Sequence, residues 1–326
     1  MKNVLITGGT GFIGANLAAR LVALGCNVRI LRRQNSDLRA ISDIDVEHRL
    51  GDVRDVRAVE SAMRGCDTVF HTAAMIHSPR SRIRAQHEVN VHGTRTVVEA
   101  CLANGIEKLV HTSSVAAIGY PDEGQLATEE TEFNWQAASG YNLSKHLAEK
   151  EVHAGVERGL NAVIVNPSVV VGERDIHTHG GELVLSSKRG RIRFYISGGM
   201  NIAYVGDVVA GHIAAAERGR VGERYILSGE NLTHKEIFER TAQLVGVRPP
   251  MARVPLSLFK AGVKMIEFAS MLLGKDPLIS SNLARVGGRY NWFSCEKARR
   301  ELGYSVTPFD QTILLCYHWY QEHGFI

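Results

Sequence analysis

Short apolar runs alternate with helical patterns over about the first 170 residues of the chain. The runs that predict strands cover residues 4–6, 27–31, 46–50, 68–71, 108–111 and 162–165. Helical patterns cover residues 12–24, 56–63, 83–104 and 141–158. This alternation predicts a doubly wound parallel sheet, because each right-handed crossover returns the chain to the same sheet. After about residue 167 the pattern becomes mixed helix and strand, without a clear linker.

A glycine-rich loop follows the first predicted strand, where residues 7–14 read Thr-Gly-Gly-Thr-Gly-Phe-Ile-Gly. Gly8 permits a tight turn, Gly11 leaves room for a phosphate, and Gly14 lets the next helix pack close to the strand. The helix that begins near Phe12 points its positive end at that phosphate. The pattern predicts a Rossmann-type dinucleotide site, and an ordinary strand–turn–helix is the alternative.

Two arginines end the second predicted strand. In a Rossmann-type fold, an acidic residue about 20 positions beyond the glycines binds the ribose 2′-hydroxyl of NAD, whereas an arginine accommodates the 2′-phosphate of NADP. Arg32 and Arg33 occupy these positions, and no carboxylate is expected beside them. The forked donors of a guanidinium suit a phosphate. We therefore expect NADP(H), with a solvated basic turn as the alternative.

The composition agrees with a soluble globular enzyme. Of the 326 residues, 44% are hydrophobic and 22% charged, and the formal net charge is +4. The basic residues are dispersed along the sequence, so nucleic-acid binding is not predicted. The length suits a dinucleotide-binding Rossmann domain over residues 1–167. Residues 168–326 are expected to form a mainly substrate-binding, mixed α/β region, with some elements returning to the Rossmann core.

The cysteines, the first residues of the chain and one apolar stretch bear on the cellular location of the protein. The five cysteines are scattered without a CxxC pair, which predicts free thiols in a reducing compartment. The chain starts directly with a core strand rather than a signal-peptide pattern, so we expect a cytoplasmic protein. Residues 256–273 are apolar, but Lys260, Lys264 and Glu267 interrupt them, so no integral membrane segment is predicted. They favour an amphipathic helix packed on the protein; contact with a membrane surface, or a lid over a lipophilic substrate, is the alternative.

A tyrosine and a lysine stand four residues apart in a predicted helix. Tyr141 and Lys145 therefore lie on one helix face. A nearby ammonium favours the phenolate and lowers the pKa of a tyrosine towards neutrality. Such a tyrosine can exchange a proton with a carbonyl or alcohol oxygen while a hydride moves to or from nicotinamide. Ser114, which follows the strand at 108–111, can hydrogen-bond the same oxygen.

Taken together, these motifs resemble the extended short-chain dehydrogenase/reductases of the epimerase/dehydratase superfamily. The resemblance covers essentially the whole chain. It rests on ordered motifs at residues 7–14, 51–53, 71–74, 90–94, 112–114, 141–145, 166–172 and 297–304. It implies a catalytic role for Ser114, Tyr141 and Lys145, with Lys145 also binding the nicotinamide ribose. The cofactor-binding residues that we assign on this basis, with the glycine loop and the two arginines, are Gly8, Gly11, Phe12, Ile13, Gly14, Arg32, Arg33, Asp52, Val53, Ala73, Ala74, Tyr141, Lys145, Pro167 and Val170.

Within the superfamily, the chain is most similar to the branch of dihydroflavonol-4-reductase-like and 3β-hydroxysteroid-dehydrogenase-like enzymes. That branch includes bacterial members described as hopanoid-associated sugar epimerases. The similarity rests on residues 28–33, 164–168 and 222–233. The rival interpretation is a sugar-nucleotide 4-epimerase that retains NAD. Such epimerases typically have an acid at the position of Arg32 and read Asn-Val-Tyr-Gly-Pro where this chain has residues 168–173, so both departures weaken that interpretation.

The sequence therefore predicts an NADP(H)-dependent oxidoreductase that interconverts a ketone or aldehyde and an alcohol. Tyr141 would supply the proton, Ser114 would orient the carbonyl oxygen, and Lys145 would lower the tyrosine pKa. The alternative outside enzymes is a nucleotide-sensing regulator, which the presence of both Tyr141 and Lys145 disfavours. A small carbonyl or alcohol is the expected partner. By analogy with relatives, we expect a homodimer formed through the helices at 83–104 and 141–158.

Several other residues carry weaker expectations. Asn90 is interpreted as architectural. His177 and His179 lack a third ligand for a metal and are assigned to a substrate-facing loop, at residues 177–181. Residues 75–84 are expected to line the same substrate cleft. The basic run at residues 188–191 is interpreted as a solvated face, with a sugar-diphosphate site as the alternative.

Overall fold

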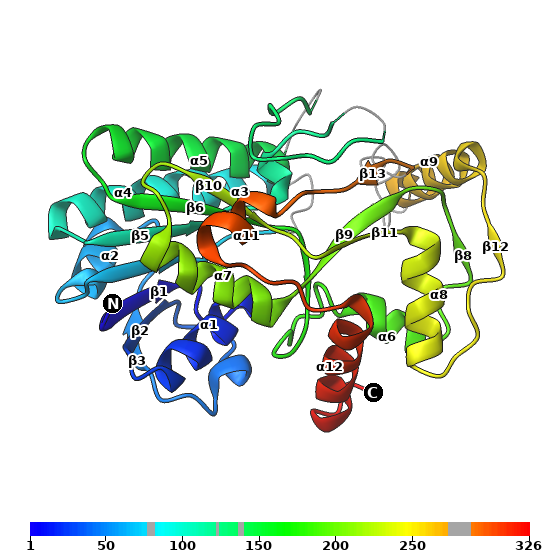
Figure 1. Cartoon of the computed structure of the whole chain (residues 1–326), viewed down its shortest axis with the longest axis horizontal. Helices are drawn as coiled ribbons and strands as arrows, with labels where there is room; N and C mark the ends of the chain where they lie inside the picture. Colours follow the sequence, from blue (N-terminus) through cyan, green and yellow to red (C-terminus); the bar gives the residue numbers. More distant parts are fainter. Residues whose placement is uncertain (77–81, 122–123, 136–139, 273–287) are drawn as a thin grey trace.

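A seven-stranded parallel sheet forms the centre of the protein (Figure 1). The computed structural model describes residues 1–76, 82–121, 124–135, 140–272 and 288–326. The strand order is β10-β6-β5-β4-β1-β2-β3, which continues the order of a Rossmann fold. The strands are β1 (Asn3–Thr7), β2 (Asn27–Arg32), β3 (Glu47–Leu50), β4 (Thr68–His71), β5 (Lys108–Thr112), β6 (Ala162–Pro167) and β10 (Arg224–Leu227). The predicted doubly wound sheet is confirmed, and its six predicted strands are present.

The seventh strand comes from a part of the chain that the sequence patterns did not assign to the sheet. β10 pairs in parallel with β6, and Arg224 lies opposite Ile164. Its residues Tyr225, Ile226 and Leu227 are fully buried. A short edge strand of this kind is hard to recognise from periodicity, because a buried parallel strand is apolar on both faces rather than alternating.

Helices cover both faces of the central sheet. One face carries α1 (Phe12–Ala23) and α7 (Val205–Arg218), which pack on each other. The other face carries α2 (Val56–Met63), α4 (Gly93–Asn104) and α5 (Tyr141–Glu157). Alternating strand residues separate the two layers: Val4 and Ile6 belong to the core beneath α1 and α7, whereas Leu5 belongs to the core beneath α2, α4 and α5. Burial of these apolar side chains is the main stabilising term of the fold.

The helix predicted over residues 83–104 is divided into three parts. α3 (Ile83–His87) passes into a π-helical turn at Glu88–His92, and α4 follows it. Asn90 lies within this turn and is buried. Widened turns of this type are frequent at functional sites, and periodicity over a long apolar pattern does not reveal them.

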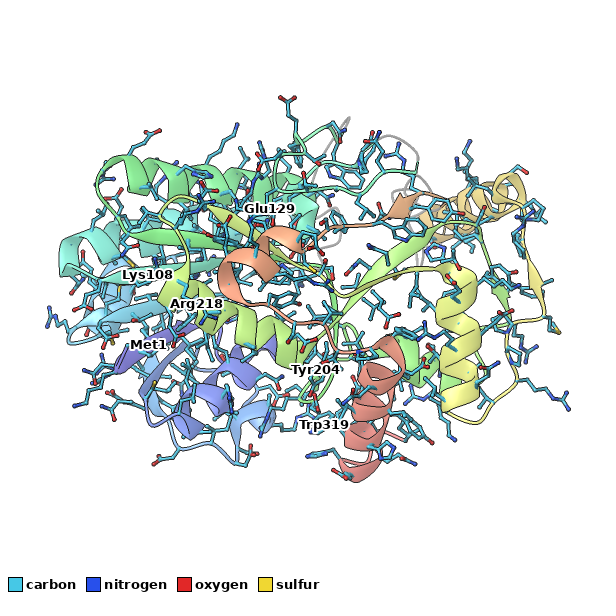
Figure 2. All side chains as sticks on the ribbon, viewed as in Figure 1. Met1, Lys108, Glu129, Tyr204, Arg218 and Trp319 are labelled. Carbon is cyan, nitrogen blue, oxygen red and sulfur yellow. The ribbon has the colours of Figure 1, made fainter. Side chains whose placement is uncertain are left out.

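A smaller mixed region extends from one end of the sheet. Its strands β7 (Val169–Val171), β9 (Gly199–Tyr204), β11 (Glu230–Thr233) and β13 (Tyr290–Asn291) form a second sheet, in which β9 pairs with the other three. A separate ribbon joins β8 (Phe194–Tyr195) to β12 (Ala252–Arg253). Among the residues that the structure describes, the helices of this region are α6 (Glu182–Lys188), α8 (His234–Leu244), α9 (Leu256–Leu272) and α12 (Phe309–Glu322). Side chains fill the space between the elements, and Tyr204 lies where β9 passes into α7 (Figure 2).

The chain returns to the central sheet after this region. α11 (Glu296–Leu302) packs against α7 and β10. Its Ala298 and Leu302 are fully buried in the same core as Val4 and Ile6. All five cysteines are free thiols, as expected. None of the helices in the described ranges is long and apolar enough to cross a membrane.

Three histidines are buried in the central sheet and its covering helices. His71 lies between the hydroxyl groups of Thr7 and Thr94, at 2.6 and 3.0 Å from its two ring nitrogens. Burial lowers the pKa of His71 to about 3 and that of His212 to about 4. Burial also holds the pKa of His111 well below its ordinary value, with smaller contributions from His71 and Lys145. Neither ring nitrogen of His111 has a hydrogen-bond partner among the described residues.

These histidines predict that the folded protein loses stability in mild acid. Between about pH 7 and pH 5 the unfolded chain takes up protons on imidazoles that stay neutral in the folded protein, so the free energy of unfolding falls with pH, by up to about 2 kcal/mol per buried histidine. Urea unfolding at the two pH values measures this loss. His111→Leu removes one of the buried imidazoles without breaking a hydrogen bond. The fall in its free energy of unfolding between about pH 7 and pH 5 should therefore be smaller than that of the parent protein. His318→Leu, at an exposed position, is the control, and equal losses in both variants would contradict the explanation.

Candidate active site

One large cavity opens at the carboxyl ends of the central strands, where ligands bind in open parallel sheets. Its volume is about 780 Å³, which is within the range of small-molecule and cofactor sites. The strand-end and helix residues that line it include every residue predicted to bind the cofactor or to take part in catalysis: Gly8, Gly11, Phe12, Ile13, Gly14, Arg32, Arg33, Asp52, Val53, Ala73, Ala74, Ser114, Tyr141, Lys145, Pro167 and Val170. The fold thus gathers residues from six strand ends into one place.

The glycine loop lies against the neighbouring strand end without room for side chains. Gly8 has a φ of +74°, and a Cβ there would lie 2.6 Å from the backbone nitrogen of Ala73. A Cβ on Gly14 would meet the carbonyl oxygen of Gly8. Gly11 precedes α1 without a side-chain cap, and the first turn of α1 carries no acidic residue. The backbone N–H groups of this turn are therefore suited to an anionic ligand.

The end of the cavity near β2 carries acidic as well as basic side chains. Asp37 and Asp52 both line it together with Arg32 and Arg33, so the expectation of no neighbouring carboxylate is wrong. Each carboxylate has an arginine partner of its own. A hydrogen bond from Arg39 lowers the pKa of Asp37 to about 2, and one from Arg54, at 2.8 Å, lowers that of Asp52.

The two arginines at this end are not equivalent. The Nε of Arg32 donates to Nδ1 of His48 at 3.2 Å, and its Nη1 approaches the carbonyl of Arg33. The Arg33 guanidinium is exposed and has no hydrogen bond or ion pair with any residue that the structure describes. Arg33 is thus the cation with all of its donors available to a ligand.

Ser114, Tyr141 and Lys145 meet at the opposite end of the cavity. Ser114 follows β5, and its Oγ accepts a hydrogen bond from the backbone N–H of Ala116 at 3.1 Å. Tyr141 is the first residue of α5, directly after Gly140, whose φ is +64°. Burial raises the pKa of Tyr141 to about 12, although a hydrogen bond with Ser114 acts in the opposite direction. The structure therefore brings the predicted serine and tyrosine together.

The lysine acts differently from the expectation. Lys145 is buried, and its Nζ donates to the backbone carbonyl of Thr112 at 2.8 Å. Burial lowers the pKa of Lys145 to about 8, and the charge of Glu149 opposes this effect. The predicted lowering of the Tyr141 pKa by Lys145 is not found: burial raises this pKa, and the influence that opposes burial is the hydrogen bond with Ser114. A spacing of one helical turn places two side chains on the same face of a helix. It does not determine how deeply each side chain is buried, and burial is the largest cause of both pKa shifts.

A buried polar network behind these residues was missed from the sequence. Glu149 lies one helical turn after Lys145 and is buried. Its carboxylate accepts from Nδ2 of Asn166 at 2.7 Å and from Arg224 of β10 at 3.2 Å. The same Nδ2 donates to the backbone carbonyl of Ser114 at 3.0 Å. The one available signal was a carboxylate four residues after Lys145, on the same helix face.

Asn90 holds the wall of the cavity in place. Its side-chain amide accepts from the backbone N–H of Met75 at 2.8 Å and donates to the Met75 carbonyl at 3.1 Å and to Oγ of Ser144 at 2.9 Å. Met75 and Ile76 line the cavity. These contacts agree with the architectural role expected for Asn90. The remainder of the segment predicted over 75–84 includes residues 77–81, which lie outside the described residues.

The other weaker expectations have separate outcomes. His177 and His179 line the cavity together with Gly180. Lys188 donates to the carbonyl of Val245 at 3.0 Å, and Arg189 donates to that of Phe325 at 3.2 Å. Neither of these two basic residues lines the cavity, so the structure does not support a sugar-diphosphate site at residues 188–191.

Comparison with known proteins identifies the family. Residues 4–228 match the model of the NAD dependent epimerase/dehydratase family. The chain is 34% identical to a putative dihydroflavonol 4-reductase of Synechocystis over 98% of this chain and 95% of the relative. It is 31% identical to sterol demethylase protein B of Methylococcus capsulatus over 99% of both proteins. The crystal structure of gox2253 superposes with a TM-score of 0.88 at 35% identity, over 99% of each chain.

The chain therefore belongs to the NAD-dependent epimerase/dehydratase family, within the extended short-chain dehydrogenase/reductase superfamily. The resemblance identified from the motifs is confirmed. Family membership and the reductase and dehydrogenase relatives support an NAD(P)-dependent oxidoreductase.

The network behind Lys145 leads to a prediction about its pKa. Glu149→Gln keeps an oxygen that accepts from Asn166 but removes the negative charge, so the pKa of Lys145 falls below its value of about 8. The titration is followed by NMR on protein labelled at the lysine Cε, with Lys145→Arg assigning the resonance. Glu151→Gln, at a partly exposed position of α5 that pairs with Arg95 of α4 at 2.7 Å, is the control. An unchanged pKa in Glu149→Gln would show that Glu149 does not act on Lys145.

Proposed function

We propose that the protein is an NADP(H)-dependent oxidoreductase that interconverts a ketone or aldehyde and an alcohol. The observation that carries this proposal is the meeting of Ser114, Tyr141 and Lys145 in the same cavity as the glycine loop. Tyr141 supplies a proton donor, Ser114 a hydrogen-bond donor for the carbonyl oxygen and Lys145 a cation. All three lie at one end of a cleft large enough for a dinucleotide. The sugar-nucleotide 4-epimerase with retained NAD is the second candidate, since epimerases share this fold and machinery.

The residues of the cavity fit a nicotinamide dinucleotide. Side chains on Gly8 or Gly14 would fill the space against the backbone where the pyrophosphate would lie. Asp52 and Val53 would contact the adenine, while Ala73, Ala74, Pro167 and Val170 would line the cleft. Lys145 would hold the nicotinamide ribose. When bound, the cofactor supplies or accepts the hydride.

In the direction of carbonyl reduction, Tyr141 acts as the proton donor. A pKa of about 12 keeps the phenol protonated at neutral pH, so its hydroxyl can donate to a carbonyl oxygen as negative charge develops there. Ser114 donates a second hydrogen bond to that oxygen. Lys145 provides the nearby positive charge, held in place by the Thr112 carbonyl.

Arg33 supports NADP(H) rather than NAD. Its exposed guanidinium offers forked donors to a 2′-phosphate, a geometry that favours bidentate hydrogen bonds. Asp37 and Asp52 are held by Arg39 and Arg54, which offset their repulsion of that phosphate. Arg32 is partly occupied by His48. We therefore assign the larger part of the phosphate contact to Arg33.

The substrate is inferred to be a lipophilic carbonyl compound rather than a sugar nucleotide. Among the relatives are a ketoreductase of a farnesyl dihydroquinoline oxide in Stigmatella aurantiaca, 29% identical, and a 2-alkyl-3-oxoalkanoate reductase in Stenotrophomonas maltophilia, 30% identical. Met75, Ile76 and Val169 give the cavity an apolar part of its wall. Lys188 and Arg189, the basic residues considered for a diphosphate, are engaged elsewhere.

The Tyr141→Phe variant tests the catalytic assignment. It is expected to retain NADPH binding, because the glycine loop, Arg33 and the other residues assigned to the cofactor are unchanged. Consumption of NADPH with an active carbonyl substrate should fall by about 100-fold or more, the range for loss of a general acid. Activity is measured by NADPH absorbance across a panel of ketones and aldehydes. Turnover close to that of the parent protein would disprove the role of Tyr141.

The Arg33→Ala variant tests the cofactor assignment. Loss of charged hydrogen bonds to a 2′-phosphate should weaken NADPH binding by about 10- to 100-fold, while NADH binding changes little. Fluorescence titration with both nucleotides gives the two Kd values. Arg49→Ala, which removes an exposed arginine of β3, is the control. An unchanged ratio of the two Kd values, or NAD retained through purification and released by heat, would favour the epimerase.

A further inference from the structure

The β8–β12 ribbon and α9, the helix that follows it, carry many exposed side chains at one end of the molecule (Figure 1), and we call these two segments the ribbon–helix surface. It comprises residues 191–196 and 248–266. Ala252 pairs with Phe194 and Arg253 pairs with Tyr195, and α9 begins at Leu256. In Figure 1 the ribbon and α9 lie at the same end of the molecule, away from the edge formed by β3.

Large apolar side chains are exposed on this surface. Met251 is 73% exposed, Met265 71%, Leu258 64% and Phe194 53%. Single exposed apolar residues are common on proteins, but several on one ribbon and the following helix are not. They indicate that this end of the molecule contacts something apolar.

The helix α9 is apolar on two opposite sides. Val263 is 2% exposed and points into the protein, together with the half-buried Phe259. Leu258, Ala261 and Met265 follow one another at spacings of three and four residues on the exposed side. A helix packed only on its own protein needs one apolar stripe. The second stripe is therefore left for an external contact.

Six exposed cations accompany the apolar residues: Arg191, Arg193, Arg248, Arg253, Lys260 and Lys264. Neither segment contains an aspartate or glutamate, and Glu267 is the first acid that follows them. None of the six pairs with a carboxylate among the residues that the structure describes. Their charge exceeds the formal net charge of +4 of the whole chain, so the rest of the protein is net negative. Basic residues that are dispersed in the sequence are thus gathered by the fold.

We propose that the ribbon–helix surface docks on an anionic lipid bilayer, with α9 lying in the plane of the interface. Exposed apolar side chains enter the boundary of the acyl chains, and flanking lysines and arginines bind the phosphate headgroups. The long aliphatic stems of Lys260 and Lys264 let their ammonium groups reach the headgroups while the helix lies deeper, at the boundary of the acyl chains.

A second copy of the chain and a nucleic acid are the two other partners considered for this surface, and both match its residues less well. In a symmetric contact between two copies, the same patch would face itself, so its unpaired cations would repel one another. A nucleic acid would satisfy the cations but would leave Leu258, Met251 and Met265 against a polar phosphate backbone. An anionic bilayer matches both the charge and the apolar side chains.

This inference does not depend on the proposed reaction, because it rests on surface residues outside the cavity. If the substrate is a lipophilic carbonyl, the surface would hold the enzyme where such a compound is concentrated. A failure of either proposal leaves the other open to its own test.

Vesicle binding tests the inference directly. Purified full-length protein is sedimented with vesicles of phosphatidylcholine alone or mixed with phosphatidylglycerol. We expect binding to the mixed vesicles at low ionic strength, weaker binding as salt screens the cations, and little binding to phosphatidylcholine alone. Absence of binding to the mixed vesicles, or equal binding to both kinds, would overturn the proposal.

Paired variants separate the two components of binding. Lys260→Glu with Lys264→Glu should weaken binding by more than about 10-fold, since each lysine near an anionic surface contributes about fivefold. Leu258→Asp with Met265→Asp should also weaken it by about 10-fold or more. The matched controls are Arg57→Glu on α2 and Val221→Asp, both at exposed positions, and circular dichroism confirms that each variant folds. Variants that bind like their controls would overturn the assignment to this surface.

Two further measurements identify a different occupant. A dimer in size-exclusion chromatography that Leu258→Asp dissociates, without vesicle binding, would assign the surface to a second copy. Binding to an oligonucleotide in preference to anionic vesicles would assign it to nucleic acid. Either result would contradict the bilayer proposal.

Discussion

The backbone contact between the glycine loop and the neighbouring strand end is the constraint on which the site depends. Gly8 approaches the backbone of Ala73, and Gly14 approaches the carbonyl of Gly8, at distances that exclude a Cβ. This close packing brings the first turn of α1 to the carboxyl edge of the sheet, with its N–H groups uncapped by side chains. Because the strands are parallel and in register, the ends of β2 to β6 then lie around the same cleft.

A second constraint joins the distant parts of the chain. Arg224, on the edge strand contributed from beyond residue 168, pairs with Glu149 of α5. Through Asn166 the same carboxylate reaches the backbone of Ser114. Buried charged groups require such partners, since an unpaired one is costly. The serine end of the site is thus supported by α5, β6 and the strand β10, which lies far from the other two in sequence.

The charged side chains are arranged differently around the cavity and on the ribbon–helix surface. Around the cavity most charges have a specific partner: Asp37 with Arg39, Asp52 with Arg54, and Lys145 with a backbone carbonyl, whereas Arg33 keeps its donors for a ligand. On the ribbon–helix surface the cations lack carboxylate partners among the described residues and lie among exposed apolar side chains. The first arrangement suits recognition of a defined small ligand, and the second suits a fluid, extended one.

The sequence by itself determined the alternating strands and helices, the glycine loop and the residue types of the Ser114–Tyr141–Lys145 group, because these depend on local periodicity and on spacing within one helix. Only the tertiary structure decided the rest. Burial, which raises the pKa of Tyr141 and lowers that of Lys145, depends on what packs over a side chain. The seventh strand, the position of Asp52 near Arg33 and the cluster of six cations arise from contacts between segments that are separated in the chain, and such contacts leave little trace in local patterns.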